Sequence, residues 1–383
     1  MRVAAVLSFS VSSLLAQATI LVGPGQTFTD LPAAVAAALP GDRVLVQAGG
    51  YSSCIVDKAI LIRAEPLGAL VVIAHTYGGS MRWQVPAGQM ATVAGIEMQT
   101  PAAVELPTGQ AVAGTVAFED VRMTQGLLVA DAHATLRGCD ISNFGFGVQL
   151  VGAATLSAVQ CAIRANFATF WPFVDGITAS GTASVHLSGC TVTGGTAGFH
   201  QLAAIGNGVA LSGNARGWFV DSTLEAYPFG PVLGFAPVGL ANQSTQPATV
   251  ERCVLRDHLG NSPASTGTVQ NGLVLGLSSA TPLARGAAFV LDYHSRPGLP
   301  VVAHAAFALG TPVSFPFVAQ PDFGFAAAAL PIAFAVADAQ GNASVTLQLP
   351  NAAWLQDLGI WFSGWSELGL PVQLAPVLGG VVR

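Results

Sequence analysis

Charged side chains are scarce in this chain of 383 residues: Asp, Glu, Lys and Arg make up 9% of it, and Lys58 is the single lysine. A typical soluble domain has about 25% charged residues. With one lysine, chemistry through a lysine Schiff base is not indicated. A net charge of −6 without a basic run also argues against a nucleic-acid partner.

Long apolar runs are lacking as well, and the one near the amino terminus is short. Apolar residues run from Val3 to Leu15, and Ala16-Gln17-Ala18 follows as a small-residue cleavage signal. A membrane-spanning helix needs about 20 apolar residues, so we interpret residues 1–18 as a secretory signal peptide that is cut after Ala18. The sequence therefore predicts a secreted or cell-surface protein with no membrane span after signal removal.

The chain does contain a repeat. A position that we call the anchor recurs at intervals of 18 to 32 residues, as in stacked repeat architectures. Positions −5, −3, 0 and +2 from the anchor are mostly apolar, whereas −4, +1 and +3 are predicted to point outward. Two residues, mostly polar or glycine, separate −3 from the anchor, as a tight corner prefers. The anchors are Ile96, Val121, Cys139, Cys161, Cys190, Ser222 and Cys253.

Each repeat contains three short strands, and one repeat cannot bury its inner face alone. Stacking the repeats gives three parallel sheets. The pattern resembles the right-handed parallel β-helix of the pectin-lyase-like superfamily over roughly residues 20 to 270. An antiparallel sandwich is the alternative, but it does not predict the short strand about thirteen residues before most anchors.

The segment before the repeats predicts a cap. Leu31 to Leu39 form a short Ala-rich helix with Asp30 as its N-cap, and Pro40-Gly41-Asp42 stops it. This order resembles the amino-terminal cap of β-helix proteins, which covers the open end of the stack. We therefore assign residues 19–271 to an all-β, three-sheet β-helix with a short N-terminal capping helix.

Residues 272–383 lose the anchor pattern. Prolines separate seven or so short apolar strands, which is typical of a β-sandwich-like domain. Segments 347–352 and 359–362 resemble small carboxyl-terminal modules of secreted bacterial proteins, and that resemblance implies no activity. We expect this C-terminal domain to pack near the last coil.

The five cysteines form no CxxC pair. Export favours disulfides, but parallel side chains in one column make poor bridge geometry. Buried thiols that behave as small apolar residues are the favoured interpretation, with a bridge or a metal site as alternatives. No metal ion and no cofactor is predicted. Four cysteines share the anchor column: Cys139, Cys161, Cys190 and Cys253.

Three consecutive repeats carry long loops, at residues 166–176, 194–208 and 226–239. The loops leave their coils at one corner and are rich in aromatic residues, which commonly stack on sugar rings. The alternative is that these rings pack on one another. Trp171, His200 and Tyr227 are the predicted ligand-binding residues because each has a polar tip.

The resemblance also implies ways to cleave polysaccharides: acidic residues with calcium and an Arg or Lys base, or paired aspartates. The chain has no adjacent Asp-Asp, no Gly-His-Gly and no Arg-x-Lys. Four other residues are catalytic candidates because they could share one face of the coil stack. The alternative is that they are ordinary solvated surface residues without a role in catalysis. We expect His186, at position −4, to be exposed, and we assign His133 no role. The catalytic candidates are Arg164, Asp175, His200 and Glu225.

Two hypotheses for the function follow. The first is a secreted β-helix protein that binds extracellular polysaccharide or cell-surface glycan without catalysis. The second is a polysaccharide lyase or glycoside hydrolase with a divergent site, which would need a carboxylate pair or an Arg-carboxylate cluster in a groove.

Overall fold

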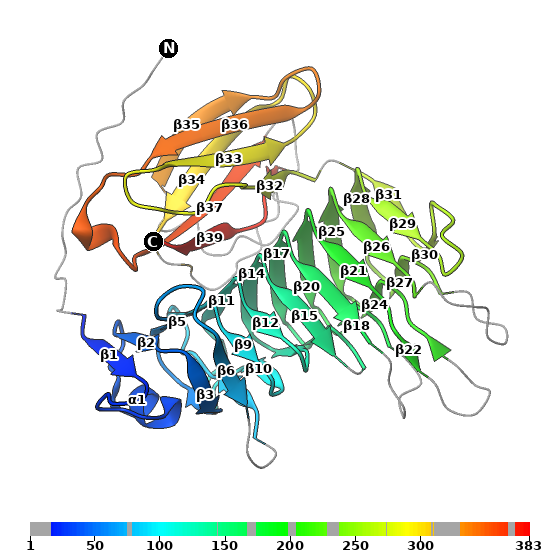
Figure 1. Cartoon of the computed structure of the whole chain (residues 1–383). Helices are drawn as coiled ribbons and strands as arrows, with labels where there is room; N and C mark the ends of the chain where they lie inside the picture. The colour runs from blue at the N-terminus through cyan, green and yellow to red at the C-terminus, as the bar shows by residue number, and fades with distance from the viewer. Residues whose placement is uncertain are drawn as a thin grey trace.

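The computed structural model describes residues 17–74, 79–143, 145–166, 174–197, 204–227, 237–272, 274–307, 309, 330–366 and 372–383. The chain forms a long stack of coils, and a C-terminal domain lies along one side of the stack (Figure 1). The predicted three-sheet parallel β-helix with a capping helix and a C-terminal antiparallel domain is confirmed. The predicted signal peptide falls almost entirely outside the described residues.

Three parallel sheets build the stack, and every coil passes through them in the order C, A, B. Sheet A contains β1 (Thr19–Val22), β2 (Arg43–Val46), β5 (Leu61–Ala64), β8 (Met90–Ala94), β11 (Thr115–Glu119), β14 (His133–Arg137), β17 (Thr155–Val159), β20 (Ser184–Ser188), β25 (Arg216–Val220), β28 (Ala248–Glu251) and β31 (Val269–Asn271). Sheet B contains β3 (Gly49–Ser52), β6 (Val71–Ala74), β9 (Glu97–Met98), β12 (Arg122–Met123), β15 (Asp140–Asn143), β18 (Ala162–Ala165), β21 (Thr191–Thr193), β26 (Thr223–Glu225) and β29 (Val254–Arg256). Sheet C contains β4 (Ile55–Val56), β7 (Met81–Trp83), β10 (Ala102–Glu105), β13 (Leu127–Ala130), β16 (Val148–Val151), β19 (Ile177–Ala179), β24 (Val209–Gly213), β27 (Leu240–Ser244) and β30 (Ser265–Gly267).

The anchor column lies inside the stack, as predicted. Cys139, Cys161 and Cys190 are each at most 3% exposed. Backbone hydrogen bonds link successive coils at this column. The residue that follows each anchor donates its N–H to the carbonyl of the anchor one coil earlier; for example, Ala162 N lies 2.9 Å from Cys139 O. All five cysteines are free thiols. The polar anchor Ser222 is satisfied, because its Oγ donates to Val220 O at 2.8 Å and accepts from Cys190 N at 3.1 Å.

The corner between sheets A and B has one backbone conformation in every repeat. The residue before each anchor has a positive φ, between 49° and 66°. This left-handed region costs an L-residue about 1–2 kcal/mol but glycine almost nothing, which explains the glycine and polar residues at the predicted corners. These residues are Gly95, Asp120, Gly138, Gln160, Gly189, Asp221 and Arg252.

Helix α1 (Leu31–Ala37) lies at the amino-terminal end of the stack (Figure 1). Asp30 Oδ1 accepts from Leu31 N at 2.8 Å and so caps the helix, and a proline follows in the first turn. Leu31, Ala34 and Val35 are buried against the first strands. The helix ends two residues earlier than the predicted Leu39.

The C-terminal domain consists of two antiparallel sheets around its own core. The smaller sheet contains β32 (Gly276–Ser278), β33 (Ala288–His294) and β36 (Asn342–Gln348). The larger sheet contains β34 (Pro300–Ala306), β35 (Leu330–Val336), β37 (Gly359–Ser366), β38 (Gln373–Leu374) and β39 (Leu378–Val381). A 3₁₀ turn, η1 (Ala353–Leu355), precedes β37, and β22 (Thr196–Ala197) pairs with β23 (Ala204–Ile205) on the coil stack. Phe289 and Phe362 stack across the two sheets with ring centroids 5.1 Å apart.

The expected packing of this domain near the last coil is wrong. Its strands lie over the outer face of sheet A, where Ser157 Oγ accepts from Val377 N at 2.9 Å and Ser188 Oγ accepts from Leu277 N at 3.1 Å. The physical reason is the row at position −4. Its side chains point out of the coil, but most of them are small or apolar, and packing of the C-terminal domain over them removes them from water. The row is Thr92, Ala117, Thr135, Ser157, His186, Trp218 and Thr249, each at most 8% exposed.

The expected exposure of His186 is wrong for the same reason. Its ring points out of the coil, as the alternation predicts, but the side chain is 4% exposed. Burial lowers the pKa of His186 to about 3, so its imidazole is neutral at physiological pH.

Candidate functional site

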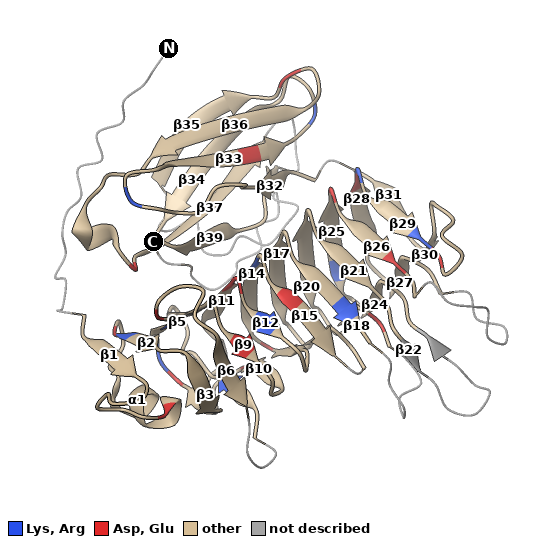
Figure 2. Ribbon diagram, in the orientation of Figure 1, with Lys and Arg blue, Asp and Glu red and all other residues tan. Residues whose placement is uncertain are grey.

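The predicted outward row that contains Arg164 and Glu225 exists on sheet B. Arg164, Thr193, Glu225 and Arg256 are in register on β18, β21, β26 and β29. Acidic and basic residues alternate along this sheet, as the red and blue strands from β9 to β18 show (Figure 2). The charges neutralise one another across coils: Arg164 Nη2 lies 2.6 Å from Asp140 Oδ1, and Arg256 Nη1 lies 2.5 Å from Glu225 Oε1.

Asp175 lies apart from that row. It is 6% exposed, at the turn that leads into sheet C, and its Oδ1 accepts from Asn207 N at 2.7 Å and from Asn207 Nδ2 at 3.0 Å. Burial raises the pKa of its carboxyl, and the hydrogen bonds from Asn207 oppose this. In turn, Asn207 Oδ1 accepts from Val238 N at 3.0 Å. Asp175 therefore links successive coils and is not placed with Arg164 and Glu225.

Two of the three predicted ligand-binding residues, Trp171 and His200, lie outside the described residues. Tyr227 is described and half-buried at the base of its loop, where its backbone N–H donates to Gly206 O at 3.4 Å.

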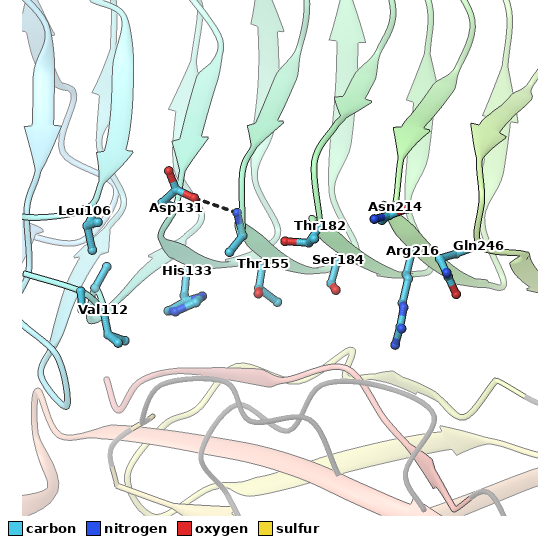
Figure 3. A pocket seen from close by; sticks show the side chains of 13 residues that line it. Leu106, Val112, Asp131, His133, Thr155, Thr182, Ser184, Asn214, Arg216 and Gln246 are labelled. Carbon is cyan, nitrogen blue, oxygen red and sulfur yellow. Dashed lines mark hydrogen bonds between the residues drawn. The ribbon is translucent and has the colours of Figure 1, made fainter. Parts of the chain in front are cut away.

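A groove of about 660 Å³ runs along the other corner of the coils, between sheets C and A. Figure 3 shows side chains from consecutive coils arranged along it, with the C-terminal domain on the opposite side. One apolar end is formed by Leu106 and Val112. The remaining lining is Ala111, Ala113, Asp131, His133, Ala153, Thr155, Thr182, Ser184, Asn214, Arg216 and Gln246.

The floor of the groove is a register-matched row. His133, Thr155, Ser184 and Arg216 are the first residues of β14, β17, β20 and β25 and pair in that order. All four side chains point toward the C-terminal domain (Figure 3). Within the described part of the chain, the hydroxyls of Thr155 and Ser184 have no hydrogen-bond partner. The row therefore offers unused hydroxyls on its two middle coils, between His133 and Arg216.

The imidazole of His133 is 7% exposed, and its Nδ1 has no hydrogen-bond partner among the described residues. Burial lowers the pKa of His133 to about 4, so the ring is neutral at physiological pH. Buried polar atoms usually have partners. An unsatisfied ring nitrogen that faces a groove is a candidate contact for a ligand hydroxyl or a bound water.

The two charged residues of the groove, Asp131 and Arg216, lie three coils apart, toward opposite ends. Asp131 accepts from Ala153 N at 2.8 Å, which holds the corner, and its other oxygen stays available. The exposed Arg216 forms no ion pair with any described residue, whereas most described arginines do. The paired arginines are Arg43, Arg63, Arg82, Arg122, Arg137, Arg164, Arg252, Arg256 and Arg383.

Comparison of the chain with models of known protein families, with curated proteins and with solved structures gave no match. Within the described ranges, no three His, Cys, Asp or Glu side chains are placed to share a metal ion. The helical segments that the structure describes include none long and apolar enough to cross a membrane.

Sequence reasoning missed this groove. The anchor pattern placed His133 at −6 and assigned it no role, because that position begins a strand and its neighbours are far away in sequence. Aligning the repeats at −6 would have brought His133, Thr155, Ser184 and Arg216 into one column. No sequence signal showed that a domain would face that column.

Proposed function

We propose that this protein is exported and binds an extracellular polysaccharide without cleaving it. The observation that carries the proposal is the groove whose polar groups repeat from coil to coil. Linear polymers suit such a site because each repeating unit meets a polar side chain at the matching position one coil further on.

The spacing of the coils supports a glycan as that polymer. Neighbouring strands of a sheet lie about 4.8 Å apart, which is close to the length of one pyranose unit in an extended chain. Hydroxyls of Thr155 and Ser184 and the amide of Asn214 can pair with sugar hydroxyls. At the apolar end, Leu106 and Val112 offer contact to the carbon face of a ring.

The charges favour binding over hydrolysis. Glycosidases use two carboxyl groups that flank the bond, and among the described residues that line the groove Asp131 is the one carboxylate. Glu225 and Asp140 are occupied by arginines, and Asp175 is held by Asn207.

A groove-blocking variant tests the proposal. Ser184→Tyr places a ring in the groove, whereas Thr191→Tyr places the same ring on the exposed face of sheet B in the same coil. We expect calorimetric titration with xylohexaose and other oligosaccharides to detect binding to wild type and to Thr191→Tyr, and none to Ser184→Tyr. Equal binding by both variants would reject the groove.

The loop residues give a second comparison. If Trp171→Ala abolished binding while Ser184→Tyr kept it, the ligand would lie on the loops that the sequence predicted, and the groove would be rejected as the site. Release of reducing ends or unsaturated products by wild type would favour the enzyme hypothesis instead.

A further inference from the structure

We infer that the groove is selective for a mostly neutral glycan that carries one isolated acidic substituent, bound in one direction with that substituent on Arg216. This inference rests on the proposed function and names the ligand class of the same site. It follows from the order of charged and neutral groups along the groove (Figure 3).

Arg216 is the attractive end. Its side chain is exposed, points into the groove and has no acidic partner among the described residues. A guanidinium can bind a carboxylate or sulfate through two parallel hydrogen bonds. In a chain in which most described arginines are neutralised by carboxylates, this cation is available to a ligand anion.

The other end disfavours further negative charge. Asp131 lies three coils from Arg216, a distance of about 14 Å at the usual strand spacing. His133 beside it adds no positive charge at neutral pH, because burial lowers the pKa of its ring to about 4. Thr155, Thr182 and Ser184 between them are neutral. A uniformly acidic polymer would place carboxylates against Asp131 in a protein whose net charge is already −6.

Opposite ends of unlike charge also fix direction. A glycan with one acidic group satisfies Arg216 in one orientation and meets Asp131 in the other. The neutral floor then pairs with the sugars that precede the acidic one.

Calorimetric titration of the full-length protein with three probes tests the inference: neutral xylohexaose, a xylo-oligosaccharide of equal backbone length with a single glucuronate branch, and hexagalacturonate. The singly charged probe should bind about tenfold more tightly than xylohexaose, as one charge-assisted contact predicts. Hexagalacturonate should bind more weakly than the singly charged probe. The tenfold preference should shrink as salt is added.

Variants assign the preference to its residue. Arg216→Gln should remove the preference, so that this variant binds the singly charged probe no more tightly than it binds xylohexaose, and the exposed side chain makes a folding defect unexpected. Arg122→Gln removes the same charge from sheet B and should keep the preference. Asp131→Asn, which retains the Oδ1 acceptor for Ala153 N, should increase hexagalacturonate affinity.

The possible outcomes distinguish a failure of the proposed function from a failure of this inference. If no oligosaccharide binds, the proposed function fails and this inference fails with it. If xylohexaose binds as tightly as the charged probe, or if Arg216→Gln keeps the preference, the groove binds glycan but the inference is wrong. Tightest binding of hexagalacturonate would also overturn it.

Discussion

At the residue scale, the coil depends on one left-handed position before each anchor. Gly189 has φ +62°, and a Cβ there would meet its nearest atom, Gln160 Cγ, at an ordinary 3.7 Å. Gly189→Ala therefore adds backbone strain without a clash and should lower the free energy of unfolding by about 1 kcal/mol. Gly50, without a positive φ or a close neighbour, is the control: Gly50→Ala should be neutral or stabilising in urea unfolding. Similar losses for both variants would contradict the corner argument.

The anchor column gives a second residue-scale prediction. Cys161 is buried between Cys139 and Cys190, and its Sγ lies 3.3 Å from Val159 O. Cys161→Ser keeps a donor for that carbonyl and should fold with a loss of about 1–2 kcal/mol. Cys161→Asp buries a charge without a partner and should prevent folding. Soluble expression and circular dichroism distinguish the two, and a folded Cys161→Asp variant would show that the column is hydrated.

At the element scale, sheet A is covered on its outer face, and this makes stability depend on pH. Burial lowers the pKa of His186 from an unfolded value of about 6.5 to about 3. Below pH 6.5 the unfolded chain therefore binds a proton that the native state does not. The free energy of unfolding should fall as pH falls from 6.5 toward 3, at about 1.4 kcal/mol per pH unit for this group.

His186→Met removes one of two such rings that the structure describes, since burial also lowers the pKa of His133 to about 4. It should reduce the slope between pH 6.5 and 4 by about 1.4 kcal/mol per pH unit in urea unfolding and leave the contribution of His133. Thr135→Val, in the same covered row, changes packing without removing a titrating group and should keep the wild-type slope. If His186→Met also kept the full slope, the ring would be accessible to protons in the native state.

Sequence reasoning recovered the coil because its cause is local. The alternation around Cys161 and the corner at Gln160 follow from strand geometry and from backbone strain, and both can be counted along the chain. The cover over His186 depends on residues about a hundred positions later, and alternation shows which way a side chain points but not what lies above it. The groove was missed for the same reason, since His133 and Arg216 come together only through strand register.

At the scale of the whole molecule, buried charges hold the C-terminal domain on sheet A. Glu119 is 2% exposed; its Oε2 accepts from Val381 N at 2.7 Å, and its Oε1 lies 3.1 Å from Arg137 Nη1. Near the amino-terminal end, Arg63 and Arg43 both pair with Asp357, at 2.7 and 3.2 Å. Residues far apart in sequence therefore fix the domain along the stack.

Removing one member of such a buried network should loosen the domain. Glu119→Ala leaves Arg137 and the chain-terminal Arg383 without their shared carboxylate, and truncating a buried pair costs about 3–5 kcal/mol. Glu97→Ala, which breaks a surface pair with Arg122 at 3.5 Å, should cost at most about 1 kcal/mol. We expect calorimetry of Glu119→Ala to show the C-terminal domain melting before the coils, and limited proteolysis to cut first between them. A single transition at the wild-type temperature would mean that apolar contacts such as Trp361 with Ala117 hold the domain without the charges.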